Sequence, residues 1–79
     1  MRQWQSDDGW HIDVRGLAAP KPLVEILRLV NSLRDSTPVI VHHERDPLLL
    51  YPELARIGWQ AVPMAADPGE VRLRLSRIP

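Results

Sequence analysis

The side chains best suited to bind a ligand fall into two short segments. One runs from Arg15 to Pro22 and contains two cations, Arg15 and Lys21, and the other is His43-Glu44-Arg45-Asp46. Cationic side chains bind carboxylates, phosphates and other small anions, arginine often with two parallel hydrogen bonds. If the fold brings these segments together, they could hold a small anion or the acidic tail of a partner. The candidate binding residues are Arg15, Gly16, Ala19, Pro20, Lys21, His43, Glu44, Arg45 and Asp46.

A purely structural role for the same side chains is the alternative, and on general grounds we favour it. Arg15 could form an ion pair with Glu44 or Asp46, and Asp46 could cap the helix that follows it. In that case no ligand is involved.

Three histidines, His11, His42 and His43, raise the question of a metal site or of acid–base catalysis. His11 begins one predicted strand and the other two end its neighbour, so we expect roughly 10 Å or more between them and no shared ion. His43 and Glu44 are a pair that a charged loop often contains by chance, and no nucleophile or cofactor fingerprint accompanies them. We predict no metal, no cofactor and no enzymatic activity.

The first half of the chain predicts two strands joined by a helix. Trp10, Ile12 and Val14 alternate with polar residues, which is typical of a half-buried strand over residues 10–15. Apolar residues then recur at helical spacing from a start near Pro20, where the fixed φ of proline suits the first turn. Residues 39–43 are a short β-branched run, and the intervening helix predicts that this strand is parallel to the first.

The second half predicts another helix and a hairpin. Pro52 would remove a hydrogen bond inside a regular helix, so we expect a 3₁₀-like turn over residues 47–50 and a helix that begins near Pro52. Residues 59–65 and 70–77 are strand-like and flank Asp67-Pro68-Gly69, a type II turn sequence. Pro63 places the first of these strands at a sheet edge. The predicted fold is an α/β domain of the α+β two-layer sandwich type, βαβαββ, with a mixed four-stranded sheet and two helices on one face. Residues 1–9 are expected to be a tail before one domain over residues 10–79.

Residues 13–22, Asp-Val-Arg-Gly-Leu-Ala-Ala-Pro-Lys-Pro, resemble the signature of the TusA/SirA-like sulfur-carrier family. In that signature a strand-ending D-x-R-G-L precedes C-P-x-P, and the similarity in element order extends over residues 10–77. The chain is most similar to a cysteine-less branch of uncharacterised, TusA-related domains. The resemblance places Ala19 where the cysteine would be, and a methyl group cannot be a nucleophile, a sulfur carrier or a metal ligand. We therefore predict that sulfur-carrier chemistry has been lost.

Composition narrows the classes of partner. Ten basic and ten acidic residues leave no net charge to attract a polyanion, so we expect no nucleic-acid partner, and the chain has no cysteine. Residues 1–9 lack an apolar run, from which we expect no membrane contact and a cytoplasmic location. We predict a non-catalytic binding or regulatory module that acts through a protein partner or self-association. The alternatives are binding of a small anion or small molecule at the N-terminus of the first helix, and an accessory role in a sulfur-relay or redox system.

The outer face of the sheet is a second candidate surface, because two-layer domains leave one face without helices. We expect it to carry His11, Asp13, Arg72 and Arg74, either as a docking surface or as a solvated face with ion pairs such as Asp13 to Arg74. Trp4 lies in the expected tail, where it would be exposed to a partner.

Overall fold

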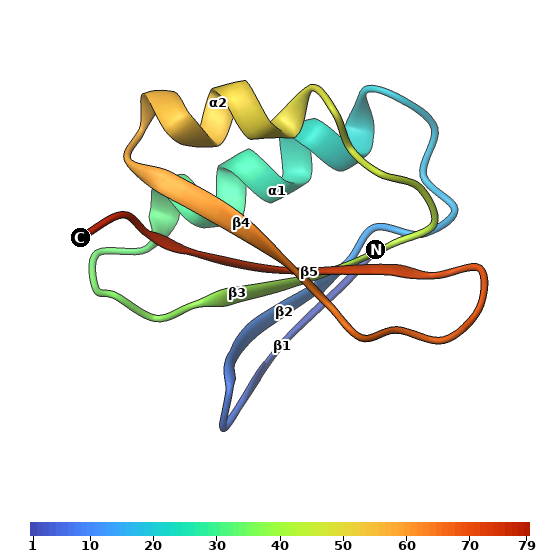
Figure 1. The fold of residues 1–79 in the computed structure, drawn as a ribbon, viewed down its shortest axis with the longest axis horizontal. Helices are drawn as coiled ribbons and strands as arrows, with labels where there is room; N and C mark the ends of the chain where they lie inside the picture. The colour runs from blue at the N-terminus through green and yellow to red at the C-terminus, as the bar shows by residue number, and fades with distance from the viewer.

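One mixed five-stranded sheet, with strand order β1-β2-β3-β5-β4, forms the first of two layers (Figure 1). The computed structural model describes residues 1–79. The elements are β1 (Arg2–Ser6), β2 (Gly9–Asp13), α1 (Lys21–Ser32), β3 (Val39–His43), α2 (Leu50–Arg56), β4 (Trp59–Met64) and β5 (Val71–Arg77). Both helices lie on the same face of the sheet (Figure 1). This confirms the predicted α+β two-layer class, and neither helix has the length and apolarity needed to cross a bilayer.

The core lies between the helices and the inner face of the sheet. Ile12 and Val14 are fully buried, as the alternation predicts, while α1 contributes Ile26 and Val30. The remaining members of the buried cluster are Leu29, Val39, Val41, Leu50, Leu54, Trp59, Leu73 and Leu75. β2 and β3 are parallel, with Trp10 opposite Val39 and Asp13 opposite His42, so the carboxyl ends of both strands lie at one edge of the core. The loops that carry the candidate residues start from these two ends.

Residues 1–9 differ from the prediction, because most of them belong to the sheet rather than to a tail. β1 pairs antiparallel with β2, which makes five strands instead of four. Its sequence, Arg-Gln-Trp-Gln-Ser, contains one large apolar residue and so carries almost no alternating signal. Trp4 is half-buried and stacks on the rings of His11 and His42, so the prediction of a freely exposed tryptophan is wrong.

The prolines act as predicted, with one shift at α2. The N–H of Leu50 donates to the carbonyl oxygen of Pro47 at 2.9 Å, an i to i+3 bond of the expected 3₁₀ type. α2 begins at Leu50, which places Pro52 third in the helix, where an N–H would have no intrahelical partner. β4 is at the sheet edge, which Pro63 requires, and Gly69 has the positive φ of +82° that a type II turn needs.

Candidate functional site

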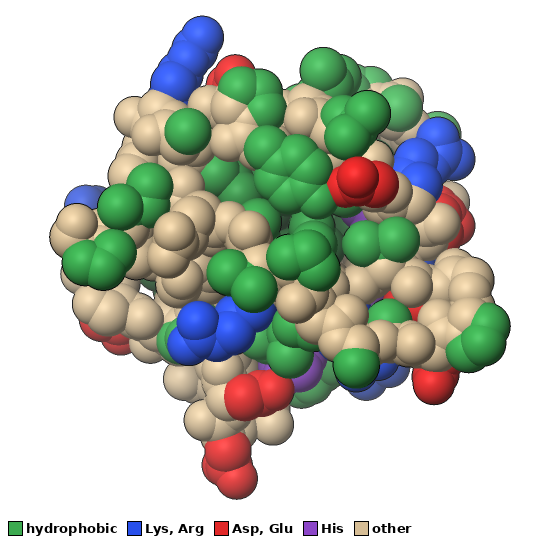
Figure 2. All heavy atoms as spheres, in the orientation of Figure 1, with side chains coloured by type: hydrophobic (Ala, Val, Ile, Leu, Met, Phe, Trp, Pro, Cys, Tyr) green, Lys and Arg blue, Asp and Glu red, His purple; other side chains and the backbone are tan.

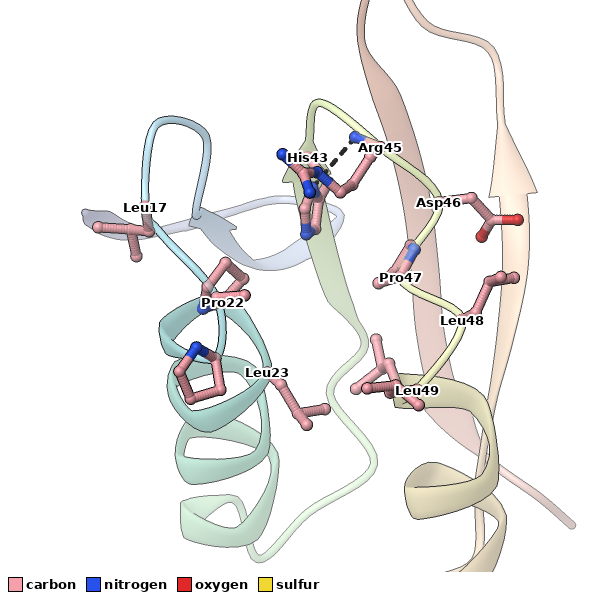
Figure 3. Close-up of a pocket in the computed structure, with 12 residues that line it drawn as sticks. Leu17, Pro22, Leu23, His43, Arg45, Asp46, Pro47, Leu48 and Leu49 are labelled. Carbon is pink, nitrogen blue, oxygen red and sulfur yellow. Dashed lines mark hydrogen bonds between the residues drawn. The ribbon is translucent and has the colours of Figure 1, made fainter.

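A pocket of about 250 Å³ opens between the start of α1 and the loop from β3 to α2. One wall is formed by Leu17, Ala19, Pro20, Pro22 and Leu23, and the other by residues 43–50 with the exception of Glu44. Leu23 and Leu49 extend toward one another across the opening (Figure 3). Figure 2 shows hydrophobic side chains gathered over the helix layer on the side of the molecule that it displays. The pocket is therefore apolar, at the edge where the two candidate loops were expected to meet.

His43 is the main polar group inside this pocket. It ends β3, points to the helix side of the sheet and is only 4% exposed. Its Nδ1 accepts a hydrogen bond from the backbone N–H of Glu44 at 2.9 Å. It accepts a second one from the backbone N–H of Arg45 at 3.2 Å, which Figure 3 shows as a dashed line. Because Nδ1 is an acceptor, the hydrogen of the neutral ring is on Nε2. Burial lowers the pKa of His43, which keeps the ring neutral at neutral pH.

The Nε2–H group of His43 is a hydrogen-bond donor without a protein partner. Every fully buried side-chain nitrogen or oxygen of the protein has a hydrogen-bond partner. Because Nε2 of His43 has none, it is not fully buried, and solvent or a ligand can reach it. The pocket is the opening that His43 lines. A ligand in the pocket would therefore meet one fixed donor among lining groups that are apolar except for Arg45 and Asp46.

The N-terminus of α1 offers less to an anion than the sequence suggests. Pro20 and Pro22 have no N–H, and the N–H of Lys21 donates to the carbonyl oxygen of Ala18 at 3.0 Å. Leu23 is left as the one early residue of the helix with a free N–H. An anion bound at a helix start normally receives several such groups, so this arrangement favours an apolar ligand over a simple anion.

The polar candidate residues divide between the pocket and its surroundings. Arg15 bonds to both carboxylate oxygens of Asp13, at 2.9 and 2.8 Å, rather than pairing with Glu44 or Asp46. This ion pair lowers the pKa of Asp13 to about 2 and raises the pKa of Arg15. The Glu44 carboxylate accepts from the backbone N–H of Gly16 at 3.3 Å, which ties the two loops together.

Asp46 does not cap α2, because the residue at the cap position is Leu49 and no side chain bonds there. Asp46 instead accepts a short hydrogen bond from the hydroxyl of Tyr51. Arg45 forms no ion pair and remains available at the pocket.

Of the nine candidate residues, five line the pocket: Ala19, Pro20, His43, Arg45 and Asp46. Lys21, Arg15, Gly16 and Glu44 do not. The residues that sequence reasoning missed are the apolar ones, Leu17, Pro22, Leu23, Pro47, Leu48, Leu49 and Leu50. The sequence gives no signal for them, because the exposure of Leu48 and Leu49, 69% and 74%, is visible only in the structure.

The histidines are arranged differently from the prediction. His43 faces the pocket, but Nδ1 of His11 and Nε2 of His42 are only 2.9 Å apart on the outer face. The expected separation of roughly 10 Å is wrong, because His11 lies in the middle of β2 and is a diagonal neighbour of His42 in the parallel register. No group of three or more histidine and carboxylate side chains is arranged to hold a metal ion.

Comparison with known proteins gives a family but no activity. A family model described as "Uncharacterized conserved protein (DUF2249)" matches residues 11–77, which include α1, β3, α2 and every residue of the pocket. No curated protein matches the chain.

Proposed function

The chain belongs to the uncharacterised conserved protein family DUF2249, and from the geometry of its pocket we propose that it is a non-catalytic binding module. Its partner is a protein segment that inserts one apolar side chain into the pocket and presents a carbonyl or carboxylate oxygen to His43. The observation that carries this proposal is the unpartnered Nε2–H of His43 at the apolar pocket between α1 and the loop before α2.

The size and polarity of the pocket support an apolar anchor. Its volume of about 250 Å³ exceeds the roughly 150 Å³ of a dry cavity that holds benzene, so a leucine or aromatic side chain fits. A single buried donor among apolar groups fixes the orientation of such an anchor, because leaving it unpaired in a complex costs free energy.

The rim of the pocket favours a protein segment over a free small molecule. Leu48 and Leu49 are more than two-thirds exposed. These side chains extend the apolar surface beyond the volume that a small ligand would fill. Central anchors surrounded by weaker apolar contacts are typical of protein–protein interfaces.

Position 19 supports a role without sulfur chemistry. Residues 13–22 resemble the signature of the TusA/SirA-like carriers. Ala19, which stands at the place of their cysteine, lines the pocket. A methyl group at that position adds apolar surface and removes the nucleophile. The module thus keeps a site at the place of the carrier thiol and uses it for binding.

The test is an amide chemical-shift titration of the ¹⁵N-labelled protein with N-acetyl-leucine, which carries an apolar side chain and a carboxylate. Inorganic phosphate and sulfite serve as ligands with charge alone. We expect saturable shifts over residues 17–23 and 43–50 with N-acetyl-leucine only. Binding of phosphate or sulfite at these amides without N-acetyl-leucine would instead support the small-anion alternative, and flat titrations with all three would contradict the pocket as a binding site.

Two variants sharpen this test. His43→Asn keeps an acceptor near the N–H groups of Glu44 and Arg45 but removes the Nε2 donor, so we expect about two- to tenfold weaker binding. Leu49→Ala should also weaken binding. Val62→Ala, which removes an apolar side chain that is 50% exposed on β4, should leave it unchanged. An effect of Val62→Ala as large as that of Leu49→Ala would move the search to the outer sheet face.

A further inference from the structure

Four side chains form a continuous hydrogen-bonded row across the outer face of the sheet. Oδ1 of Asp8 lies 2.7 Å from Nε2 of His11, Nδ1 of His11 lies 2.9 Å from Nε2 of His42, and Nδ1 of His42 lies 3.0 Å from Oε1 of Glu70. Asp8 comes from the turn after β1, His11 from β2, His42 from β3 and Glu70 from the residue before β5. We call these four residues the histidine row.

The number of hydrogens that the row needs exceeds the number that its neutral rings carry. Each of its three contacts requires one hydrogen, and ionised carboxylates supply none. Two neutral imidazoles carry one N–H each, which satisfies two contacts and leaves two acceptors facing each other at the third. All three contacts are satisfied only when the two rings share a third proton, so that together they carry one positive charge.

The carboxylates at both ends are held in the ionised form. The hydrogen bond from His42 lowers the pKa of Glu70, and the hydrogen bond from His11 lowers the pKa of Asp8. Arg72 of β5 also bonds to Glu70, at 3.1 Å. The extra hydrogen therefore belongs on the rings rather than on a carboxyl group.

The charges around the row favour one added proton. Three carboxylates face the rings, those of Asp8, Glu70 and Asp13 of β2, while two guanidinium groups bond to them, Arg72 on Glu70 and Arg15 on Asp13. This leaves one negative charge, which a single proton on the histidine pair neutralises. Two further arginines are on this side and disfavour protonation of the rings: Arg2 of β1, which lies over the ring of Trp4, and Arg74 of β5, in register with Ile40. Asp7 lies with Asp8 in the turn after β1, and β4 contributes no titratable side chain.

Trp4 covers the two rings from above. Its ring centroid is 4.9 Å from that of His11 and 5.4 Å from that of His42, with interplanar angles of 16° and 30°. The π face of an indole attracts a cation. The side chains of His11, His42 and Glu70 are at most 12% exposed, so the shared charge is largely shielded from water.

We propose that His11 and His42 together bind one proton at neutral pH, and that this proton fastens the β1–β2 hairpin to β3 and to the start of β5. β1 pairs with β2 alone, and the stacking of Trp4 on His42 attaches it to β3. When the proton leaves, one contact of the row is lost, and β1 loosens.

The direct test is an imidazole ¹H–¹⁵N spectrum of the labelled protein, recorded across the range of about pH 5 to 8 in which histidine charge changes. At pH 7 we expect three N–H hydrogens on His11 and His42 together, while His43 shows a neutral ring with its hydrogen on Nε2 and serves as the internal reference. Two hydrogens on the pair at pH 7 would overturn the proposal.

The decisive variant is Glu70→Gln, because a glutamine amide donates a hydrogen itself. It can satisfy Nδ1 of His42, so that two neutral rings complete the row without an added proton. We expect the pair to be neutral at pH 7 in this variant. Glu53→Gln, which removes a partly exposed carboxylate on α2 far from the row in sequence, is the matched control and should leave the wild-type pattern intact. A third hydrogen that persists in Glu70→Gln would also overturn the proposal.

Hydrogen exchange tests the consequence for β1. After correction for the intrinsic effect of pH on exchange, β1 amides of the wild type should lose about tenfold or more protection above the pH at which the pair loses its proton, since a hydrogen bond to a charged group is lost. The same amides in Glu70→Gln should keep a constant protection. Equal pH profiles in the two proteins would show that the proton does not hold β1.

Discussion

Gly9 fixes the position of the β1–β2 hairpin, and its replacement by alanine should be among the most damaging single changes in the protein. Gly9 has a φ of +129°, and a Cβ at this position would lie 2.4 Å from the carbonyl oxygen and 3.1 Å from the carbonyl carbon of Pro38. That carbonyl oxygen also accepts a hydrogen bond from the N–H of Trp10 at 2.9 Å. The obstacle is therefore backbone that is held in place rather than the flexible end of a side chain.

The expected cost follows from these two features. Holding an L-residue in such a sparsely populated backbone region costs about 1–3 kcal/mol, and the clash with Pro38 adds to it. We expect Gly9→Ala to lower the free energy of unfolding by about 3 kcal/mol or more. A domain of this length has a total stability of about 4–12 kcal/mol. The loss would thus be a large part of the whole, or all of it.

Gly69→Ala is the matched control. Gly69 has a φ of +82°, but a Cβ there meets nothing within 4 Å, so only the backbone cost of about 1–2 kcal/mol applies. Urea denaturation followed by far-ultraviolet circular dichroism measures both variants, and an unchanged m-value would show that the denatured state is comparable. If Gly9→Ala costs no more than Gly69→Ala, the close approach of the hairpin to Pro38 is not fixed, and the placement of Asp8 and His11 in the histidine row loses its support.

Two further predictions concern ionisation. Burial, together with the hydrogen bond to Asp46, raises the pKa of Tyr51 to about 12, so an ultraviolet titration of this single tyrosine should give a midpoint near pH 12, and Asp46→Asn should move it toward 10. A midpoint near 10 in the wild type would contradict the short bond. The pKa of Asp13 is lowered from 3.8 to about 2 by Arg15, so the stability that this pair contributes is present above about pH 4 and is lost as the pH falls toward 2. The difference in unfolding free energy between the wild type and Arg15→Gln should accordingly shrink over that interval, and a constant difference would assign the effect of Arg15 to packing.

Local patterns in the sequence were sufficient to predict most of the elements. The alternation of Trp10, Ile12 and Val14 predicted the buried side of β2 because side chains of a strand point alternately to its two faces. Pro63 indicated an edge strand and Pro52 a helix start, since a missing N–H is tolerated only where no partner is needed. These predictions depend on neighbours in the chain, which the sequence shows directly.

The candidate site was only partly predictable. The two loops meet because both follow parallel strands, which the order of elements implied. Yet the ligand-facing surface is mostly apolar, contributed by Leu23, Leu48 and Leu49, whereas sequence reasoning selected the charged residues. Arg15 illustrates the difficulty, because its partner is Asp13, two residues away, and several carboxylates of the same loops were equally plausible partners from the sequence.

The sequence by itself determined that the protein has no thiol at position 19, that two helices cover one face of a sheet and that the net charge is zero. Only the tertiary structure decided that residues 2–6 are a strand and that His11 meets His42 in a row between two carboxylates. The physical reason is that composition and periodicity report burial, whereas a contact between strands depends on register and on rings long enough to reach a diagonal neighbour. The number of protons in the histidine row follows from that register, and no local pattern of residues contains it.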